Sequence, residues 1–384
     1  METLISIPIS LGSERSLHIQ QKQKSSSFLG TLQSLVSGAP SGAIHVQNVP
    51  AGAGAVVEVC GQPTASHDVR NNSVDKTQTI VVNTVSAEPL QIYLRWPKGA
   101  EEVGLDQLKL QSSDYHIKWD IETPNVPAGA KHLSPADVDF RPARELLVAS
   151  TSGGISGLIP MMDLLNVSTS SGTADITLLP LYYNKSAAHE TKLSIKSNSG
   201  SLSINSKLDA AAAAAAGVHS PGRDCHVSIQ SSSGTIRSVL GMTKLTSIKS
   251  SSGSQHLTAL LRDLSLDRRS DLATTTTSGS QNITIVAAPD EDKTAGAAEK
   301  AGKAGEVGYM CRHKSSSGSV WIAYPGVWEG TVEAHSNSAS IAVTGEGVET
   351  DRVRNTRTAV KGTPVHHTDV DTSWGAVSVR FGEA

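Results

Sequence analysis

Two histidines and two aspartates stand close together near the end of the chain, at His366, His367, Asp369 and Asp371. Imidazole nitrogens and carboxylate oxygens are common ligands of divalent cations in proteins. On a β-strand, side chains two residues apart share a face, so His367, Asp369 and Asp371 together could hold one ion. The same spacing is also typical of the solvent-facing side of an ordinary strand. We therefore expect no metal and no cofactor here.

Four aromatic side chains near the C-terminus could stack on a ligand, because flat aromatic faces suit the apolar faces of sugar rings. They are Trp321, Tyr324, Trp328 and Trp374. Packing inside the fold explains the same residues equally well. The sequence thus indicates candidate ligand-stacking residues without deciding between the two roles.

We find no catalytic motif. The phosphate-binding loop needs Gly-x₄-Gly-Lys-Ser/Thr, but the segment 296–304 has five intervening residues and Ala304 in place of the hydroxyl. The nucleophile elbow needs Gly-x-Ser-x-Gly, but Ser156 stands directly before Gly157. Lys249 and the charged residues between 262 and 269 could serve a sugar-cleaving enzyme, although a solvated loop at 260–271 explains them more simply. We predict no catalytic residues.

The dominant feature is an internal repeat built around Ser-Ser-Gly and related triplets. Aligning the chain on the last residue of the triplet gives eight units, with centres at Gly172, Gly200, Gly234, Gly253, Gly279, Gly318, Ala339 and Gly375. A hydroxyl residue stands three positions before every centre. Ser stands directly before seven centres, and Trp374 before the eighth. A looser ninth unit lies at 147–158 and a decayed tenth at 108–119.

Each unit predicts a strand, a tight corner and a second strand, because apolar residues spaced by two flank the centre. Glycine permits a positive φ, so we expect positive φ at Gly234 and Gly253. The hydroxyl residues can bond backbone groups that a bend leaves without strand partners. The shortest spacings between centres are 19 residues, from Gly234 to Gly253, and 21 residues, from Gly318 to Ala339. Such spacings fit one coil of a stacked β-structure.

We therefore predict an all-β fold, a β-solenoid or roll-like stack of strand–corner–strand repeats, with an antiparallel β-sandwich as the alternative. Residues 1–42 are expected to form a disordered tail, with a short helix at 28–36. Residues 43–145 are expected to form a β-rich cap region continuous with the stack, and residues 146–384 are expected to form the stack itself. Flexible insertions are expected at 207–224, 288–306 and 344–366, since these segments cannot bury much apolar area.

Composition narrows the functional class. The 384 residues carry a formal net charge of −3, which provides no basic surface for nucleic acid. No apolar run approaches the length of a membrane span. The N-terminus has no basic segment followed by an apolar stretch. An intracellular location is expected by default, with the cell surface, reached by non-classical export, as the alternative.

The repeats at 197–204 and 315–322 read Ser-Asn-Ser-Gly-Ser-Leu-Ser-Ile and Ser-Ser-Ser-Gly-Ser-Val-Trp-Ile. They resemble the repeats of adhesin-type domains of unknown function, which occur in bacteria and, in diverged form, in fungal proteins. The resemblance covers roughly residues 145–384 and, more weakly, 79–120. It implies a non-enzymatic scaffold that binds a surface, a glycan or a protein, and it brings no catalytic residue. The alternative is a carbohydrate-active enzyme on a β-helix.

The last predicted strand, 377–381, runs almost to the final residue, and a terminal rung exposes an unpaired edge. We expect this strand to be covered by a loop or by the N-terminal tail, or to pair edge to edge with a second chain.

Overall fold

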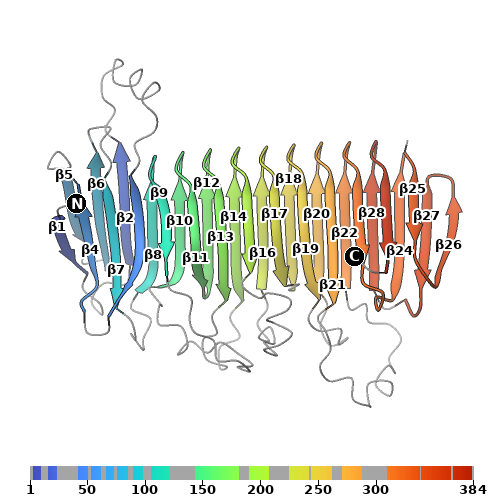
Figure 1. Ribbon diagram of the computed structural model, residues 1–384, viewed down its shortest axis with the longest axis horizontal. Helices are drawn as coiled ribbons and strands as arrows, with labels where there is room; N and C mark the ends of the chain where they lie inside the picture. Colours follow the sequence, from blue (N-terminus) through green and yellow to red (C-terminus); the bar gives the residue numbers. More distant parts are fainter. Residues whose placement is uncertain are drawn as a thin grey trace, which may run out of the picture. The chain divides into compact units, whose positions relative to one another are not determined.

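The protein is all-β in every part that its computed structural model describes. The described residues are 3–9, 16–23, 42–50, 53–61, 66–72, 76–84, 90–97, 105–121, 143–180, 190–206, 225–241, 244–261, 270–287, 309–337, 339–364 and 366–382. They form 29 strands in two mixed sheets, sheet 1 with 14 strands and sheet 2 with 15 strands (Figure 1). The predicted fold class is confirmed. No helix within these ranges is long and apolar enough to cross a membrane.

The chain divides into two compact units, each with strands in both sheets. Unit 1 contains strands β1 to β13, and unit 2 contains β15 to β29; β14 (Thr191–Ser197) is divided between them.

In unit 1, sheet 1 has the order β1 (Thr3–Pro8), β4 (Val56–Cys60), β7 (Gln91–Pro97), β3 (Ala43–Val49), β9 (His116–Asp120), β11 (Ile155–Met161) and β13 (Ala174–Pro180). Sheet 2 there has the order β12 (Leu164–Thr169), β10 (Ala143–Ser150), β8 (Leu105–Ser112), β2 (Ser16–Gln23), β6 (Thr77–Thr84) and β5 (Ser66–Asn72).

In unit 2, sheet 1 has the order β15 (Leu202–Ser206), β17 (Ile236–Gly241), β19 (Gln255–Leu261), β21 (Gln281–Ala287), β23 (Val320–Tyr324), β29 (Val377–Phe381) and β25 (Ile341–Thr344). Sheet 2 there has the order β16 (Cys225–Ser231), β18 (Leu245–Ser250), β20 (Ser270–Thr276), β22 (Tyr309–Ser315), β28 (His366–Thr372), β24 (Gly330–Ser336), β27 (Thr356–Lys361) and β26 (Val348–Val353).

Strands of successive repeats pair in parallel and in register. Ile229 lies opposite Ile248, and Ile248 lies opposite Thr274, all of them five positions before their repeat centres. Antiparallel pairing joins β1 to β4, β4 to β7 and β5 to β6 in unit 1, and β24 to β27 and β27 to β26 in unit 2. Parallel stacking of the repeats supports the solenoid and not the antiparallel sandwich.

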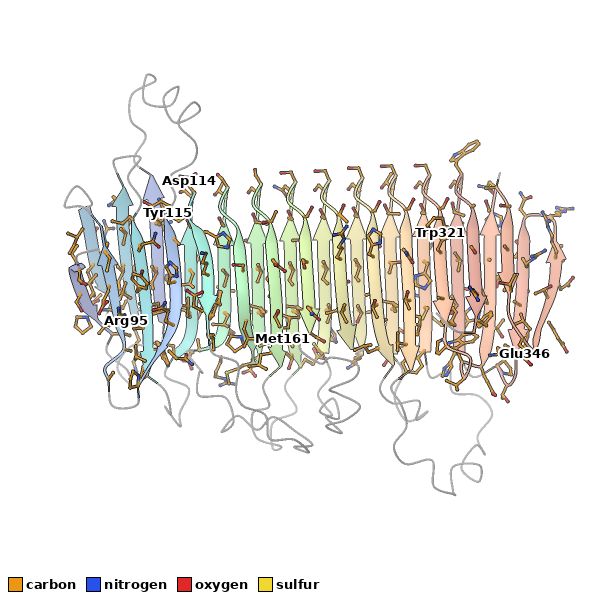
Figure 2. The ribbon with its side chains drawn as sticks, viewed as in Figure 1. Arg95, Asp114, Tyr115, Met161, Trp321 and Glu346 are labelled. Carbon is orange, nitrogen blue, oxygen red and sulfur yellow. The ribbon has the colours of Figure 1, made fainter. Side chains whose placement is uncertain are left out.

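Buried side chains of the two sheets meet inside each unit. In unit 2, Thr274 of sheet 2 hydrogen-bonds Gln281 of sheet 1, and Tyr324 of sheet 1 bonds Thr368 of sheet 2. Burial alternates along the strands, as in β14, where every second residue is buried. In unit 1, Figure 2 shows Asp114 at the corner end of the strands and Met161 at the opposite end.

Spatial order and chain order differ in both units. In unit 2, β28 lies between β22 and β24, and β29 lies between β23 and β25. The last two strands of the chain therefore insert between rungs that precede them. The expectation that 377–381 is a terminal strand, covered by a loop or the N-terminal tail or paired with a second chain, is wrong, because β29 is paired on both sides within its own sheet. In unit 1, β2 lies between β8 and β6, and β3 lies between β9 and β7.

The segment 344–366, expected to be a flexible insertion, forms two strands instead. β26 and β27 make an antiparallel hairpin, and β27 pairs with the edge of β24. Arg354, in the turn, adopts a left-handed φ of 55°. β26 then ends sheet 2 with exposed charges at Glu349, Asp351 and Arg352. Charges on an edge strand discourage pairing with another chain.

Residues 1–42, expected to be a disordered tail, contain the strands β1 and β2. Leu17 and Ile19 of β2 are fully buried, whereas His18 between them and Gln20 after Ile19 are half-buried on the outward face. Only two apolar residues are needed to fix this strand, which explains why its composition looks like that of a polar tail. The predicted helix at 28–36 and the insertions at 207–224 and 288–306 lie outside the described residues.

Candidate functional site

The repeat centres lie at corners between the two sheets, and their glycines stack on one another. A Cβ on Gly253 would overlap the carbonyl oxygen of Gly234, and a Cβ on Gly279 would overlap that of Gly253. Gly172, Gly200, Gly318 and Gly375 meet the preceding stacked glycine in the same way. None of the described repeat centres has a positive φ. The expectation of positive φ at Gly234 and Gly253 is therefore wrong: close approach of the backbones, and not a left-handed turn, requires glycine.

Hydroxyl groups hold each corner together. At the corners of unit 2, the residue three before the centre accepts a hydrogen bond from the centre's N–H, as Ser250 Oγ does from Gly253 at 3.0 Å. The residue directly before the centre donates to the neighbouring rung, as Ser252 Oγ does to the carbonyl of Ser232 at 3.1 Å. Thr276, Ser315 and Thr372 repeat the first bond, and Ser199, Ser278 and Ser317 repeat the second. Much of the Ser/Thr repeat is thus structural.

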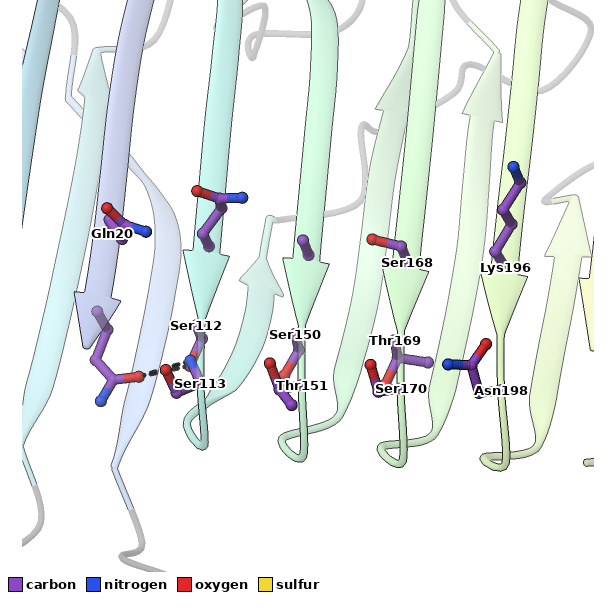
Figure 3. Close-up of a pocket in the computed structure, with 13 residues that line it drawn as sticks. Gln20, Ser112, Ser113, Ser150, Thr151, Ser168, Thr169, Ser170, Lys196 and Asn198 are labelled. Carbon is purple, nitrogen blue, oxygen red and sulfur yellow. Dashed lines mark hydrogen bonds between the residues drawn. The ribbon is translucent and has the colours of Figure 1, made fainter. Parts of the chain in front are cut away.

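Beside the corners of unit 1 lies a hollow of about 390 Å³, the polar hollow (Figure 3). Outward side chains of β2, β8, β12 and β14 line one part of it: Gln20, Gln111, Ser168 and Lys196. Corner residues line the other part: Ser113, Thr151, Ser170 and Asn198. The corner residues are positioned by backbone bonds between rungs, such as that from Thr151 N–H to the Ser112 carbonyl at 3.0 Å.

The strand register aligns the residues of the polar hollow. Gln20 lies opposite Gln111, Gln111 opposite Ala149, and Ala149 opposite Ser168. Lys196 is the only ionisable side chain among the residues that line the hollow. The lining therefore offers amide and hydroxyl groups, which both donate and accept hydrogen bonds, together with one cation. Such a surface suits uncharged polar groups.

A buried glutamine closes the end of the polar hollow. Gln21, at 1% exposure, accepts hydrogen bonds through Oε1 from Ser112 Oγ at 3.0 Å and from Ser113 N–H at 2.9 Å. Its neighbour Gln20 points to the opposite, outward face. The polar stretch of β2 is thus divided between holding a corner and lining the hollow. This arrangement leaves no local signal in the sequence, because residues 20 and 111 are far apart in the chain.

The four candidate aromatic residues do not form one site. Tyr324 and Trp328 are buried, with ring centroids 4.5 Å apart, and both pack against Phe381. Trp321 is 52% exposed on the outward face of β23, and Trp374 is 72% exposed at a corner. Solvent therefore reaches only two of the four rings, those of Trp321 and Trp374.

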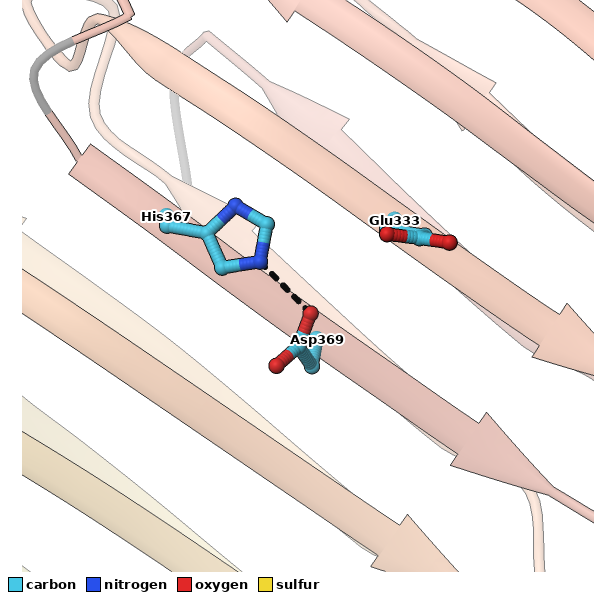
Figure 4. Close-up of side chains that lie close together, drawn as sticks. All are labelled: Glu333, His367 and Asp369. Carbon is cyan, nitrogen blue, oxygen red and sulfur yellow. Dashed lines mark hydrogen bonds and ion pairs between the residues drawn. The ribbon is translucent and has the colours of Figure 1, made fainter.

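The histidine and aspartate cluster is divided by the alternation of β28. His367, Asp369 and Asp371 share the outward face, as predicted, and His366 is buried against Trp328. Burial lowers the pKa of His366, and the charge of Glu329 partly opposes this shift. The structure also brings Glu333 of β24 beside His367 and Asp369 (Figure 4).

The charged residues considered for a sugar-cleaving site are only partly described. Lys249 is exposed on the outward face of β18, and residues 262–269 lie outside the described ranges.

Comparison with known proteins identifies no family. No protein-family model matches the chain, and no curated protein matches it. Among solved structures, one match is the crystal structure of a candidate cell adhesion protein from Clostridium sporogenes ATCC 15579, with 5% sequence identity, a TM-score of 0.20, and coverage of 98% of each chain.

Proposed function

We propose that the protein is a non-enzymatic binding scaffold, and that the polar hollow holds a neutral polymer of glycan type lying across the strands. The observation that carries this proposal is the aligned row of Gln20, Gln111 and Ser168 on one outward face. Neighbouring strands lie about 4.8 Å apart. An extended polymer crossing them therefore meets hydrogen-bonding groups from successive rungs.

The chemistry of the lining favours an uncharged ligand. Sugar hydroxyls donate and accept hydrogen bonds, and the side-chain amides of Gln111 and Asn198 do the same. Lys196 alone gives little attraction for a densely acidic polymer. The hollow lies on paired strands and on corners that are bonded from rung to rung, so binding requires little ordering of the backbone.

The same lining supports a non-enzymatic role over the alternative of a carbohydrate-active enzyme. Most glycosidases need a pair of carboxyl groups that flank the bond they cleave. No carboxylate is among the residues that line the polar hollow. The carboxylates of Glu333 and Asp369 lie on the outward face of β24 and β28 in unit 2 instead.

Affinity electrophoresis of the full chain through native gels that contain soluble neutral polysaccharides tests the proposal. Gln111→Ala should lower the affinity for the polysaccharide, measured by the retardation, about fivefold, which corresponds to the loss of one hydrogen bond of about 1 kcal/mol. Gln230→Ala is the matched control. The two glutamines occupy the same position in their repeats, four residues before the corner residue. Gln230 stands four before Gly234. Gln111 stands four before Tyr115, whose N–H makes the corner bond to Ser112 Oγ at 2.8 Å.

Three results would contradict the proposal. One is a wild-type protein that no neutral polysaccharide retards. Another is equal weakening by the Gln111 and Gln230 substitutions. The third is release of reducing ends from a bound polysaccharide, since this would indicate an enzyme.

The intracellular location stays a prediction, and tagging the protein in its own host tests it.

A further inference from the structure

We propose that Glu333, His367 and Asp369 form a binding site for one divalent transition-metal ion, with Zn²⁺ as the first candidate. This site goes beyond the proposed glycan binding and lies in unit 2. One ligand atom from each residue can be chosen so that all three lie within 4.8 Å of one another. Ligand atoms around one Zn²⁺ are roughly 3–4 Å apart, because each lies about 2.0–2.2 Å from the metal. Small side-chain rotations therefore suffice to bring the three onto one ion.

The strand register brings the three residues together. Glu333 of β24 lies directly opposite Asp369 of β28, and His367 stands two residues before Asp369 on the same outward face. His367 Nε2 already lies 2.6 Å from Asp369 Oδ1. A bound ion would replace this hydrogen bond with one bond to each atom. Strands that are paired on both sides hold all three residues, so the site is built on a rigid surface.

The charges around the site favour a cation. Glu333 and Asp369 are like charges directly opposite on paired strands, an arrangement that destabilises a sheet. On its other side Glu333 faces the uncharged Thr358 of β27. Arg312 Nε lies 4.0 Å from Asp369 Oδ2, and Arg312 stands on β22, at the opposite side of β28 from Glu333 on β24. A divalent ion between Glu333 and Asp369 would remove their repulsion.

The donor set selects the class of metal. One imidazole nitrogen suits Zn²⁺, Cu²⁺, Ni²⁺ and Fe²⁺ better than Mg²⁺ or Ca²⁺. Two carboxylates with one histidine supply three protein ligands, which leaves the remaining coordination positions to water. His367 is about one-third exposed and Asp369 less than half exposed, so an ion can enter from solvent.

Isothermal titration of the untagged, EDTA-treated full chain with ZnCl₂ tests this proposal. Wild type should bind one more Zn²⁺ than His367→Ala, or bind it at least about tenfold more tightly. The comparison between variants is needed because the chain has 13 histidines and imidazole is a common ligand of Zn²⁺. His335→Ala is the matched control, because His335 lies on the same face of β24, two residues beyond Glu333, and should leave Zn²⁺ binding unchanged.

Glu333→Gln provides a second test, because its melting temperature relative to that of wild type should change sign when Zn²⁺ is added. In EDTA its melting temperature should equal or exceed that of wild type, because the repulsion from Asp369 is removed. With Zn²⁺ the melting temperature should rise in wild type and much less in Glu333→Gln. The proposal is overturned if wild type and His367→Ala bind the same number of Zn²⁺ ions with the same affinity. It is also overturned if Zn²⁺ stabilises Glu333→Gln as much as wild type.

Discussion

The hydroxyl of Thr274 lies 2.8 Å from Nδ1 of His313 in the core of unit 2. Thr274 donates its hydroxyl hydrogen to Oε1 of Gln281 at 2.6 Å, so Nδ1 of His313 must carry the proton of the ring. Thr274 and His313 lie opposite each other on β20 and β22. Both occupy the position five before a repeat centre, where Ile229 and Ile248 stand in other units. Two polar residues in consecutive units thus bond each other inside an otherwise aliphatic layer, while Nε2 of His313 is buried without a hydrogen-bond partner among the described residues.

We expect His313 to make the protein sensitive to acid. Burial lowers its pKa from 6.5 to about 3 in the folded protein. Above pH 6.5 the side chain is neutral in both the folded and unfolded states and adds no pH dependence. Below pH 6.5 the unfolded state takes up a proton that the folded state does not, so the free energy of unfolding falls as the pH falls. The slope from this residue is about 1.4 kcal/mol per pH unit, continuing to about pH 3.

Urea unfolding between pH 7.5 and 4 measures this slope. Other groups also titrate in this range, so the relevant quantity is the difference between wild type and His313→Val, a variant that restores the aliphatic residue usual at this position. The variant should lose less stability per pH unit. Identical pH profiles for the two proteins would show that His313 is not held neutral by the fold.

We expect the stacked glycines to be intolerant of a single methyl group. Gly253→Ala should lower the free energy of unfolding by about 1–3 kcal/mol, because its Cβ must displace the backbone of Gly234. Gly326→Ala is the control, since no heavy atom lies within 4 Å of the Cβ position there. It should change stability by less than about 0.5 kcal/mol. Equal effects in a denaturant titration would contradict the stacking of corners.

The repeat pattern could predict the stack because its signals are local. Residues such as Ser250 and Gly253 recur at fixed offsets, and identical offsets favour identical corners that pile on one another. The pattern could not predict the spatial order of the rungs. The alternation of buried and outward residues in β28 and β29 would be the same at any position in the sheets. Only non-local pairing with β22, β23, β24 and β25 decides where the two strands lie.

The repeat pattern also could not predict the polar hollow or the position of Glu333 beside His367 and Asp369. Gln20 and Gln111 meet only because β2 inserts beside β8, and Glu333 meets Asp369 only because β28 inserts beside β24. The hairpin of β26 and β27 lacks a Ser-Ser-Gly corner, so the repeat pattern does not predict it. Its alternating Val and Thr residues were the available signal for two strands.

We expect the exposed Trp374 to contribute nothing to stability. It replaces the serine whose hydroxyl elsewhere donates to the neighbouring rung, and its own N–H keeps the backbone bond to the Ser316 carbonyl at 3.0 Å. Trp374→Ser should therefore leave the free energy of unfolding unchanged or raise it by up to about 1 kcal/mol. A clear loss of stability in a thermal melt would mean that the ring packs on the protein and is not held free for a ligand.

We expect the charges on β26 to keep the end of sheet 2 in unit 2 from pairing with a second chain. Glu349, Asp351 and Arg352 lie on a strand paired only with β27 among the described strands. Replacing all three with Thr removes the charges and raises the β-propensity of an open edge. The triple variant should show a mass that rises with concentration in size-exclusion chromatography with light scattering. Lys249→Thr, on β18 with a paired strand on either side, should behave as wild type. A triple variant no more associated than wild type would mean that something other than charge protects this edge.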